Sequence, residues 1–205
     1  MTLSDLVADG RAAVVTMEIQ RGVIGDLSSF PELAQEAERV GLIENTGRLL
    51  GAARRHGVAV VHCTAGFRAD RLGSPANAPL MTAVFRRPEH LLENTAAVEL
   101  VADLGAEPTD LVSHRRHGVS PFVGTTLDPT LRALGISTVV AAGVSLNLGI
   151  IGLAVEAVDL GYRVVVATDA VAGIPRHYAD EVLRHTLALV ATLATVDEIV
   201  GAFGP

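Results

Sequence analysis

Residues 138–168 read TVVAAGVSLNLGIIGLAVEAVDLGYRVVVAT, and this stretch decides the fold class. It begins with the apolar, partly β-branched run Thr138 to Ala142 and passes through a glycine-containing turn, Gly143 to Gly149. Apolar residues with helical spacing follow over Asn147 to Leu160, and Arg163 to Thr168 is a second β-type run. A strand, a helix and a strand in this order predict two parallel strands joined by a right-handed crossover.

Part of this stretch also has to be weighed as a membrane span. Ile136 to Val155 carries no charged residue and is about long enough to cross a bilayer. Gly143, Ser145 and Asn147 interrupt it, however, and its two halves have different periods. We therefore interpret it as a buried strand, a turn and a helix.

The same alternation extends over the rest of the chain. Further strands are predicted at Ala12 to Met17, Val58 to Cys63, Leu111 to His114 and Thr192 to Val196, and further helices at Pro31 to His56, Leu127 to Leu134 and Ala179 to Ala191. The segment Thr64 to Asn94 has no clear period and is predicted to be a long loop over a functional site. We predict one α/β domain over residues 1–205, a three-layer, Rossmann-like open parallel sheet of about six strands with helices on both faces.

Composition excludes several classes of partner. The chain has 205 residues, 16 basic against 23 acidic, a net charge of −7, and no basic cluster longer than a pair, which argues against binding to nucleic acid or an anionic membrane. A small molecule is the expected substrate. The single cysteine, Cys63, can form no internal disulfide, and the N-terminus lacks the features of a signal peptide, so a reducing cytoplasm is the expected compartment.

The ends of the predicted strands nominate the site, because ligands of open parallel sheets bind beyond the carboxyl ends of the strands. The residues found there are Glu18 and Gln20, His62 and Cys63, Arg115 and Arg116, the turn Gly143 to Gly149, and Asp169. Glu18 is either a general acid or base at the edge of the core or a helix-capping or ion-paired carboxylate. Arg116 is either a clamp for a substrate carboxylate or part of a solvated surface pair. The turn either offers N–H groups to a developing negative charge or only allows close packing of helix and sheet.

Three segments together resemble the isochorismatase-like hydrolase family, which includes isochorismatases, nicotinamidases and N-carbamoyl amidohydrolases. They are Glu18-Ile19-Gln20, residues 116–127 (RHGVSPFVGTTL) and residues 143–149 (GVSLNLG). Residues 154–173 (AVEAVDLGYRVVVATDAVAG) are similar to a further family pattern. The resemblance spans nearly the whole chain and implies the fold described above.

The resemblance also implies which residues would carry the chemistry. At the three catalytic positions of the family this chain has Glu18 for Asp, Arg116 for Lys and Gly149 for Cys. The residues expected to bind substrate are Gln20, His62, His117, Phe122, Val144, Ser145 and Asn147. Family amidases use the cysteine thiolate as nucleophile, and glycine cannot take that role. True isochorismatases also carry glycine there and hydrolyse a vinyl ether with a carboxylic acid as proton donor.

Two functions therefore remain open. The first is a hydrolase without a cysteine nucleophile, in which Glu18 is the general acid or base acting on a small metabolite with a carboxylate or carbonyl group. The second is a catalytically inactive family member that acts as a binding or scaffold protein. Cys63 is not expected to replace the nucleophile, because neighbouring strand residues point to opposite faces and cysteine is commonly buried. No cofactor and no metal are expected, and the resemblance implies a homodimer or a larger homo-oligomer.

Overall fold

The computed structural model describes residues 1–204, and its centre is a six-stranded sheet in the order β3-β2-β1-β4-β5-β6. The strands are β1 (Ala12–Met17), β2 (Ala59–Ala65), β3 (Leu111–Arg115), β4 (Thr138–Val144), β5 (Arg163–Ala172) and β6 (Thr192–Ala194). Every neighbouring pair is parallel. The predicted α/β class with a parallel sheet is confirmed.

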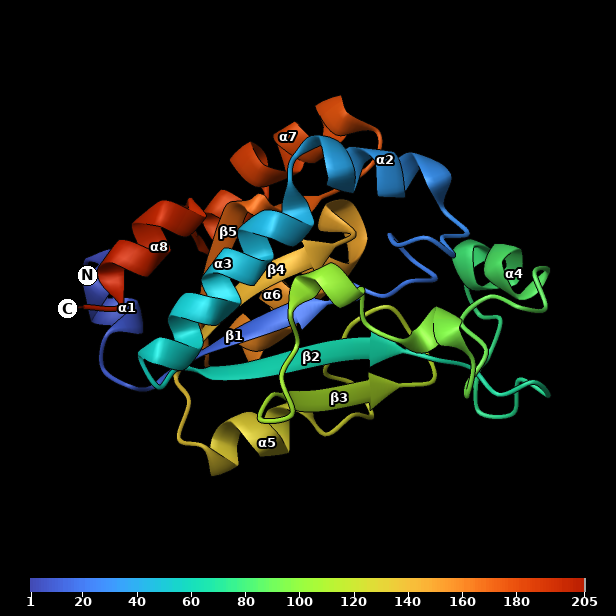
Figure 1. Cartoon of the computed structure of the whole chain (residues 1–205), viewed down its shortest axis with the longest axis horizontal. Helices are drawn as coiled ribbons and strands as arrows, with labels where there is room; N and C mark the ends of the chain where they lie inside the picture. The colour runs from blue at the N-terminus through green and yellow to red at the C-terminus, as the bar shows by residue number, and fades with distance from the viewer. Residues whose placement is uncertain (205) are drawn as a thin grey trace.

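Helices cover both faces of this sheet. They are α1 (Leu3–Val7), α2 (Pro31–Arg39), α3 (Leu42–Arg55), α4 (Pro79–Phe85), α5 (Leu127–Ala133), α6 (Ile151–Asp159), α7 (Arg176–His185) and α8 (Val196–Ala202). In Figure 1, α3 and α8 lie in front of the sheet and α5 and α6 lie behind it. Both termini lie at one end of the sheet, and the strands β1, β2 and β3 point towards the other end, where α4 lies.

Side chains along each strand point alternately to the two faces of the sheet. Ala12 and Val14 of β1 belong to the core shared with α3, whereas Ala13, Val15 and Met17 belong to the core shared with α5 and α6. All six residues of β1 are buried. Strands buried on both faces need apolar residues at every position, which explains the continuous apolar runs in the sequence.

Two expectations about helices are corrected by the structure. The single helix expected over residues 31–56 is two helices, α2 and α3, because Gly41 adopts a φ of 66° and turns the chain between them. The segment expected to be a loop over residues 64–94 contains α4. Among residues 1–204, no helix combines the length and the apolar composition that a membrane crossing requires.

The turn after β4 brings residues 145–149 next to the end of β1. Gly143 pairs with Met17, and its φ is 112°. A Cβ atom at this position would lie 2.2 Å from the Met17 carbonyl oxygen, so the approach of the two strands requires glycine. After the cis peptide bond Val144–Ser145, one π-helical turn over Leu146–Ile150 leads into α6.

Candidate active site

Glu18 follows β1 directly and anchors the candidate site. Its backbone adopts a φ of 51°, a conformation that residues other than glycine rarely adopt, and its N–H donates to the Cys63 carbonyl (2.9 Å). Its carboxylate accepts a hydrogen bond from the Arg115 guanidinium in an ion pair. The Glu18 side chain is 16% exposed and that of Arg115 is 7% exposed, so the pair is largely withdrawn from water.

The partner of Glu18 is thus Arg115, whereas Arg116, which the resemblance placed at the Lys position of the family, does not line the cavity described below. Arg116 is 56% exposed and forms an ion pair with Glu93 (2.5 Å) outside the site. The reason is the alternation along β3, where Ser113 and Arg115 are buried and His114 and Arg116 lie on the other side. The sequence does not show which side of this strand faces the core, so alternation alone could not single out Arg115.

A cavity of about 240 Å³ borders this ion pair. Its polar lining is Glu18, Arg115, Ser145 and Asn147. The remaining walls are Val23, Phe30, Leu33, Leu80, Val119, Leu148, Gly149 and Ile174. The cavity is therefore mostly apolar, with its charged groups at the end of the sheet where the fold predicts a ligand.

The turn at residues 145–149 contributes one wall of this cavity. The Ser145 hydroxyl donates to Asn147 Oδ1 (3.0 Å), and Asn147 Nδ2 donates to the Ile174 carbonyl (3.2 Å). The Leu148 and Ile150 N–H groups donate to the Ser145 carbonyl (3.2 and 3.0 Å). Two N–H groups at the start of this helical turn thus already have acceptors. A ligand anion at the turn would have to bind to other N–H groups.

Gly149 borders the cavity and has little room for a side chain. A Cβ atom on Gly149 would lie 3.1 Å from both Met17 Cε and the Val144 carbonyl oxygen. Met17 therefore packs directly against the position that the family resemblance assigns to the nucleophile. Any larger residue would have to displace these neighbours by a few tenths of an ångström.

Of the residues expected to bind substrate, only Ser145 and Asn147 border the cavity. Gln20 is fully buried, and its side-chain amide holds three backbone groups: it donates to the Ala65 and Val98 carbonyls and accepts from the Ala65 N–H. Gln20 thus fastens the ends of β1 and β2 to the segment before β3. His117, Phe122 and Val144 do not line the cavity either, and Phe122 and Val144 are buried in the two cores.

His62 is also absent from the cavity and belongs to a buried polar row across the sheet. Its Nδ1 lies 2.7 Å from Thr16 Oγ1 and its Nε2 lies 3.1 Å from Asp110 Oδ2. Burial lowers the pKa of His62, although the Asp110 carboxylate opposes that shift. With 1% of its side chain exposed, His62 cannot meet a ligand, and the row is a structural feature of the fold.

Cys63 lies in the core that faces α5 and α6, and it does not border the cavity. Burial raises the pKa of its thiol to about 12. At neutral pH the side chain is therefore a thiol, which is neither a good nucleophile nor a metal ligand. Asp169 is likewise outside the cavity, because β5 continues past it and its carboxylate accepts from the Val196 N–H at the start of α8 (2.8 Å).

Comparison with known proteins gives the family. The Isochorismatase domain model matches residues 12–198, from β1 into α8. The chain belongs to the isochorismatase family. An uncharacterised isochorismatase family protein of Escherichia coli O157:H7, YecD, is 30% identical over 194 residues, which cover 93% of this chain and 95% of that protein. The ureidoacrylate amidohydrolase RutB of Variovorax paradoxus is 30% identical over 179 residues, 80% of this chain and 70% of that protein.

A solved isochorismatase family structure from Burkholderia thailandensis has the same fold. It superposes with a TM-score of 0.79 at 24% identity and covers 96% of this chain and 97% of that one. The isochorismatase family is thus supported by sequence over almost the whole chain and by the arrangement of the sheet. It is a family of hydrolases, and amidohydrolases are among the relatives of this chain.

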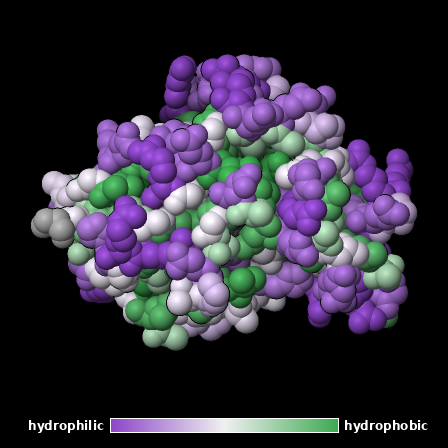
Figure 2. All heavy atoms as spheres, in the orientation of Figure 1, coloured by the Kyte–Doolittle hydropathy of each residue, from purple (hydrophilic) through white to green (hydrophobic). Residues whose placement is uncertain are grey.

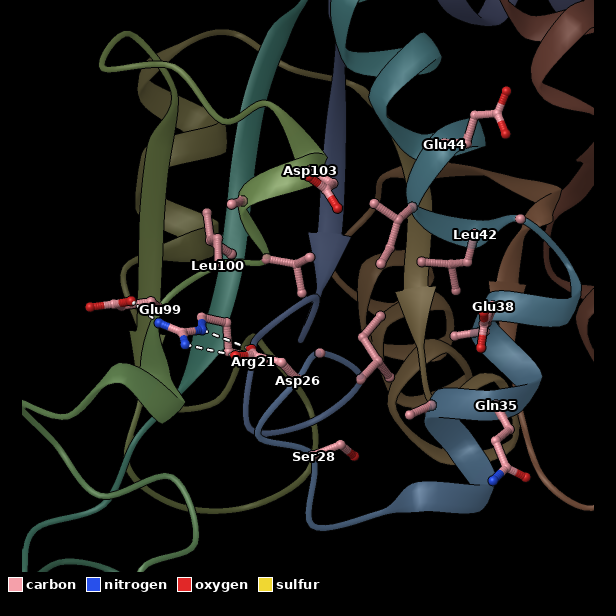
Figure 3. A pocket seen from close by; sticks show the side chains of 18 of the residues that line it. Arg21, Asp26, Ser28, Gln35, Glu38, Leu42, Glu44, Glu99, Leu100 and Asp103 are labelled. Atoms are coloured by element: carbon pink, nitrogen blue, oxygen red, sulfur yellow. Dashed lines mark hydrogen bonds and ion pairs between the residues drawn. The ribbon is translucent and has the colours of Figure 1, made fainter.

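A larger hollow lies on the α2 and α3 side of this isochorismatase-family protein, away from Glu18. Its volume is about 970 Å³, and its acidic lining residues are Asp26, Glu38, Glu44, Glu99 and Asp103. Figure 3 shows Arg21 in this hollow, bonded to Asp26 and Glu99, so the one arginine there is already paired. Figure 2 shows apolar atoms in the centre of this face with hydrophilic side chains around them. Volume alone does not locate the chemistry, and among residues 1–204 the ion pairs that line this hollow, Arg21 with Asp26 and with Glu99, are partly exposed.

Sequence reasoning missed most of the cavity wall, and it also missed His90. His90 is 7% exposed and lines, together with Glu18 and Arg115, a smaller space that shares part of its wall with the cavity. Its Nδ1 lies 2.6 Å from the Ser29 hydroxyl, and its ring packs against Phe30 and Phe67. Burial, together with nearby arginines, lowers the pKa of His90 to about 4. The imidazole is therefore uncharged at neutral pH.

The lowered pKa of His90 predicts a loss of stability in acid. In the unfolded chain the His90 imidazole binds a proton below its usual pKa of 6.5, whereas in the folded chain it does so only near pH 4. The contribution of the neutral imidazole to the stability of the fold is therefore present above pH 6.5 and is lost as the pH falls to 4. From pH 7 to pH 4, we expect the free energy of unfolding to fall by about 2 to 3 kcal/mol less in His90→Gln than in the unmutated protein. Urea denaturation at several pH values measures this. His185→Gln is the control, since His185 is 71% exposed, and an equal decline in His90→Gln and the unmutated protein would contradict the assignment.

Proposed function

We propose that this isochorismatase-family protein is a hydrolase that works without a cysteine nucleophile and uses Glu18 as its general acid or base on a small carbonyl-containing metabolite. The observation that carries the proposal is the Glu18–Arg115 ion pair at the border of a cavity that Gly149 also lines. Arg115 takes the role for which the sequence pattern had suggested Arg116. The nucleophile is then a water molecule.

The chemistry of such a site balances without a covalent intermediate. In the ion pair Glu18 is a carboxylate, which can take a proton from water while the water oxygen attacks the substrate carbonyl carbon. The protonated Glu18 then gives that proton to the leaving amine or alcohol as the bond to carbon breaks. Donors at the cavity, including the Arg115 guanidinium, would stabilise the negative charge that develops on the carbonyl oxygen.

Amides are the first substrates to test, because ureidoacrylate amidohydrolase is among the relatives of this chain. Esters are included because the same general-base step hydrolyses them, and vinyl ethers because they test the acid role, which requires the protonated form of Glu18. Turnover of any of them supports hydrolysis. Binding without turnover across the panel would instead support the alternative of a binding or scaffold protein.

Independence from cysteine gives a direct prediction. We expect Cys63→Ala, and alkylation of the unmutated protein with iodoacetamide, to leave kcat/KM within about twofold of its normal value, because the buried thiol is protonated and does not border the cavity. Steady-state kinetics on the substrate found in the panel measure this. A loss of turnover on alkylation, with unchanged circular dichroism, would contradict a cysteine-independent mechanism.

A further inference from the structure

Next to the cavity bordered by Glu18 and Arg115 lies a smaller space beside α4, called the inner chamber below. The inner chamber has a volume of about 60 Å³. Residues that border both spaces are Glu18, Val23, Phe30, Leu80, Arg115 and Val119. The ion pair therefore stands at the junction between the outer cavity and the inner chamber.

Apart from the ion pair, the inner chamber is lined by uncharged groups. Its own walls are Ala65, Phe67, Met81, Val84, His90, Leu91 and Gly118. His90 is uncharged at neutral pH, and one of its nitrogens is already bonded to Ser29. A group that enters the inner chamber gains contact with apolar surface and meets no further charge.

The volume of the inner chamber limits what can enter it. A water molecule occupies about 30 Å³ in the liquid, so a space of about 60 Å³ accepts a group of about two or three carbon atoms. Propyl and isopropyl groups are of this size. Longer chains would have to extend into the outer cavity instead.

The charges at the junction discriminate between ligand head groups. Glu18 and Arg115 neutralise each other, so an incoming carboxylate would add an uncompensated negative charge next to Glu18 in a space withdrawn from water. A neutral carbonyl adds no charge and needs only a hydrogen-bond donor. Arg115 borders the cavity and is the residue there that carries guanidinium donors. Its Nε is buried and has no acceptor among residues 1–204, and a buried donor without an acceptor is unfavourable.

We infer that the site selects an uncharged carbonyl compound with a short aliphatic group, the aliphatic group lying in the inner chamber and the carbonyl oxygen lying at Arg115. This inference rests on the proposed function, because it takes the cavity at Glu18 to be the hydrolytic site, and it adds which substrates that site accepts. It narrows the substrate from carboxylates and carbonyl compounds in general to neutral amides, esters or ketones with about two or three carbon atoms beyond the carbonyl.

Binding can be tested without turnover. Isobutyramide and isobutyrate have the same shape and differ in charge, and their affinities for the full-length protein at pH 7.5 can be measured by ligand-observed NMR. We expect the amide to bind at least about tenfold more tightly than the carboxylate. In Glu18→Gln the site carries one net positive charge, so the preference should shift towards isobutyrate. Equal binding of the two probes, stronger binding of the carboxylate, or no binding of the amide would overturn the inference.

Chain length tests the inner chamber itself. In the series propionamide, butyramide, pentanamide and hexanamide, each methylene that enters the chamber should raise affinity about fourfold until the chamber is full. Val84→Ala enlarges the chamber and should move the optimum to a longer chain. Ala83→Ser is the matched control, because Ala83 is the exposed neighbour of Val84 on α4. An unchanged optimum in Val84→Ala, with folding verified by circular dichroism, would overturn the placement.

The two proposals can fail separately. If amides bind with the expected preference but are not turned over, the selectivity holds and the hydrolytic function fails. If a charged or bulky substrate is hydrolysed with dependence on Glu18, the hydrolytic function holds and the selectivity fails.

Discussion

Glu18→Gln is expected to lower kcat/KM by about 10² to 10⁴-fold for any substrate that the protein hydrolyses, which is the usual loss when a general acid or base is removed. Glutamine keeps nearly the same size and can still accept a hydrogen bond from Arg115, but its amide cannot take or give a proton at neutral pH. The loss should appear mainly in kcat, because the acid–base group acts in the transition state rather than in binding. Steady-state kinetics on the substrate from the hydrolysis panel measure both constants.

The chain offers a matched control for Glu18→Gln. Glu93 also forms an ion pair with an arginine, Arg116, but this pair does not border the cavity. Glu93→Gln should therefore leave kcat/KM within about twofold, because Glu93 does not border the cavity in which the substrate would lie. Turnover that survives in Glu18→Gln at the normal rate would remove Glu18 from the mechanism.

Asp110→Ala is expected to lower the free energy of unfolding by about 3 kcal/mol, the usual cost when one partner of a buried ion pair is removed. The Asp110 side chain is 3% exposed and accepts from Arg54 through both of its oxygens (3.0 and 2.6 Å). It also lies 3.1 Å from His62 Nε2 and accepts from the Glu107 N–H. Its removal leaves Arg54 without its main partner and His62 without one of its two.

The comparison for Asp110→Ala is another aspartate that pairs with an arginine of α3. Asp197 contacts Arg48, but both side chains are mostly exposed, at 75% and 51%. Asp197→Ala should therefore cost less than about 1 kcal/mol. Urea denaturation of both variants, followed by circular dichroism, measures the difference, and equal costs would show that the buried row does not contribute as described.

Acid should weaken the buried row as well. Burial raises the pKa of Asp110, but hydrogen bonds from Arg54, the Glu107 backbone and His62 outweigh it, so the pKa lies below the usual 3.8. A carboxyl with a lowered folded-state pKa stabilises the fold above its unfolded pKa, and that stability is lost as the pH falls through the folded pKa. The cost of Asp110→Ala should therefore decrease below about pH 4.

The sequence predicted the elements whose signals are local. β1 has the predicted range, Ala12–Met17, because a continuous apolar run before a charged residue is visible without any partner. The break between α2 and α3 was missed, since the apolar spacing continues across it and only the backbone of Gly41 reveals the turn. The helix α4 was missed because its seven residues are too few to show a clear period.

In the candidate site, too, some features could be predicted from neighbouring residues and others could not. Glu18 follows a buried strand, so its place at the end of the sheet could be predicted from residues that are its neighbours in the chain. Arg115 comes from β3, two strands away, and which of two adjacent arginines meets Glu18 depends on the side to which each residue of that strand points. Gln20 was expected to bind a ligand, but it lies where backbone groups of Ala65 and Val98 occupy its amide.

The sequence by itself therefore determined the six strands in their order along the chain, the parallel sheet, the carboxylate that follows β1 and the glycine in the turn that follows β4. These properties depend on apolar periodicity and on residues close together in the chain. Only the tertiary structure decided that Glu18 pairs with Arg115, that Met17 packs against Gly149, and that α4 lines an apolar chamber. Those contacts join segments far apart in sequence, and they are set by strand direction and side-chain packing, for which no local pattern carries the information.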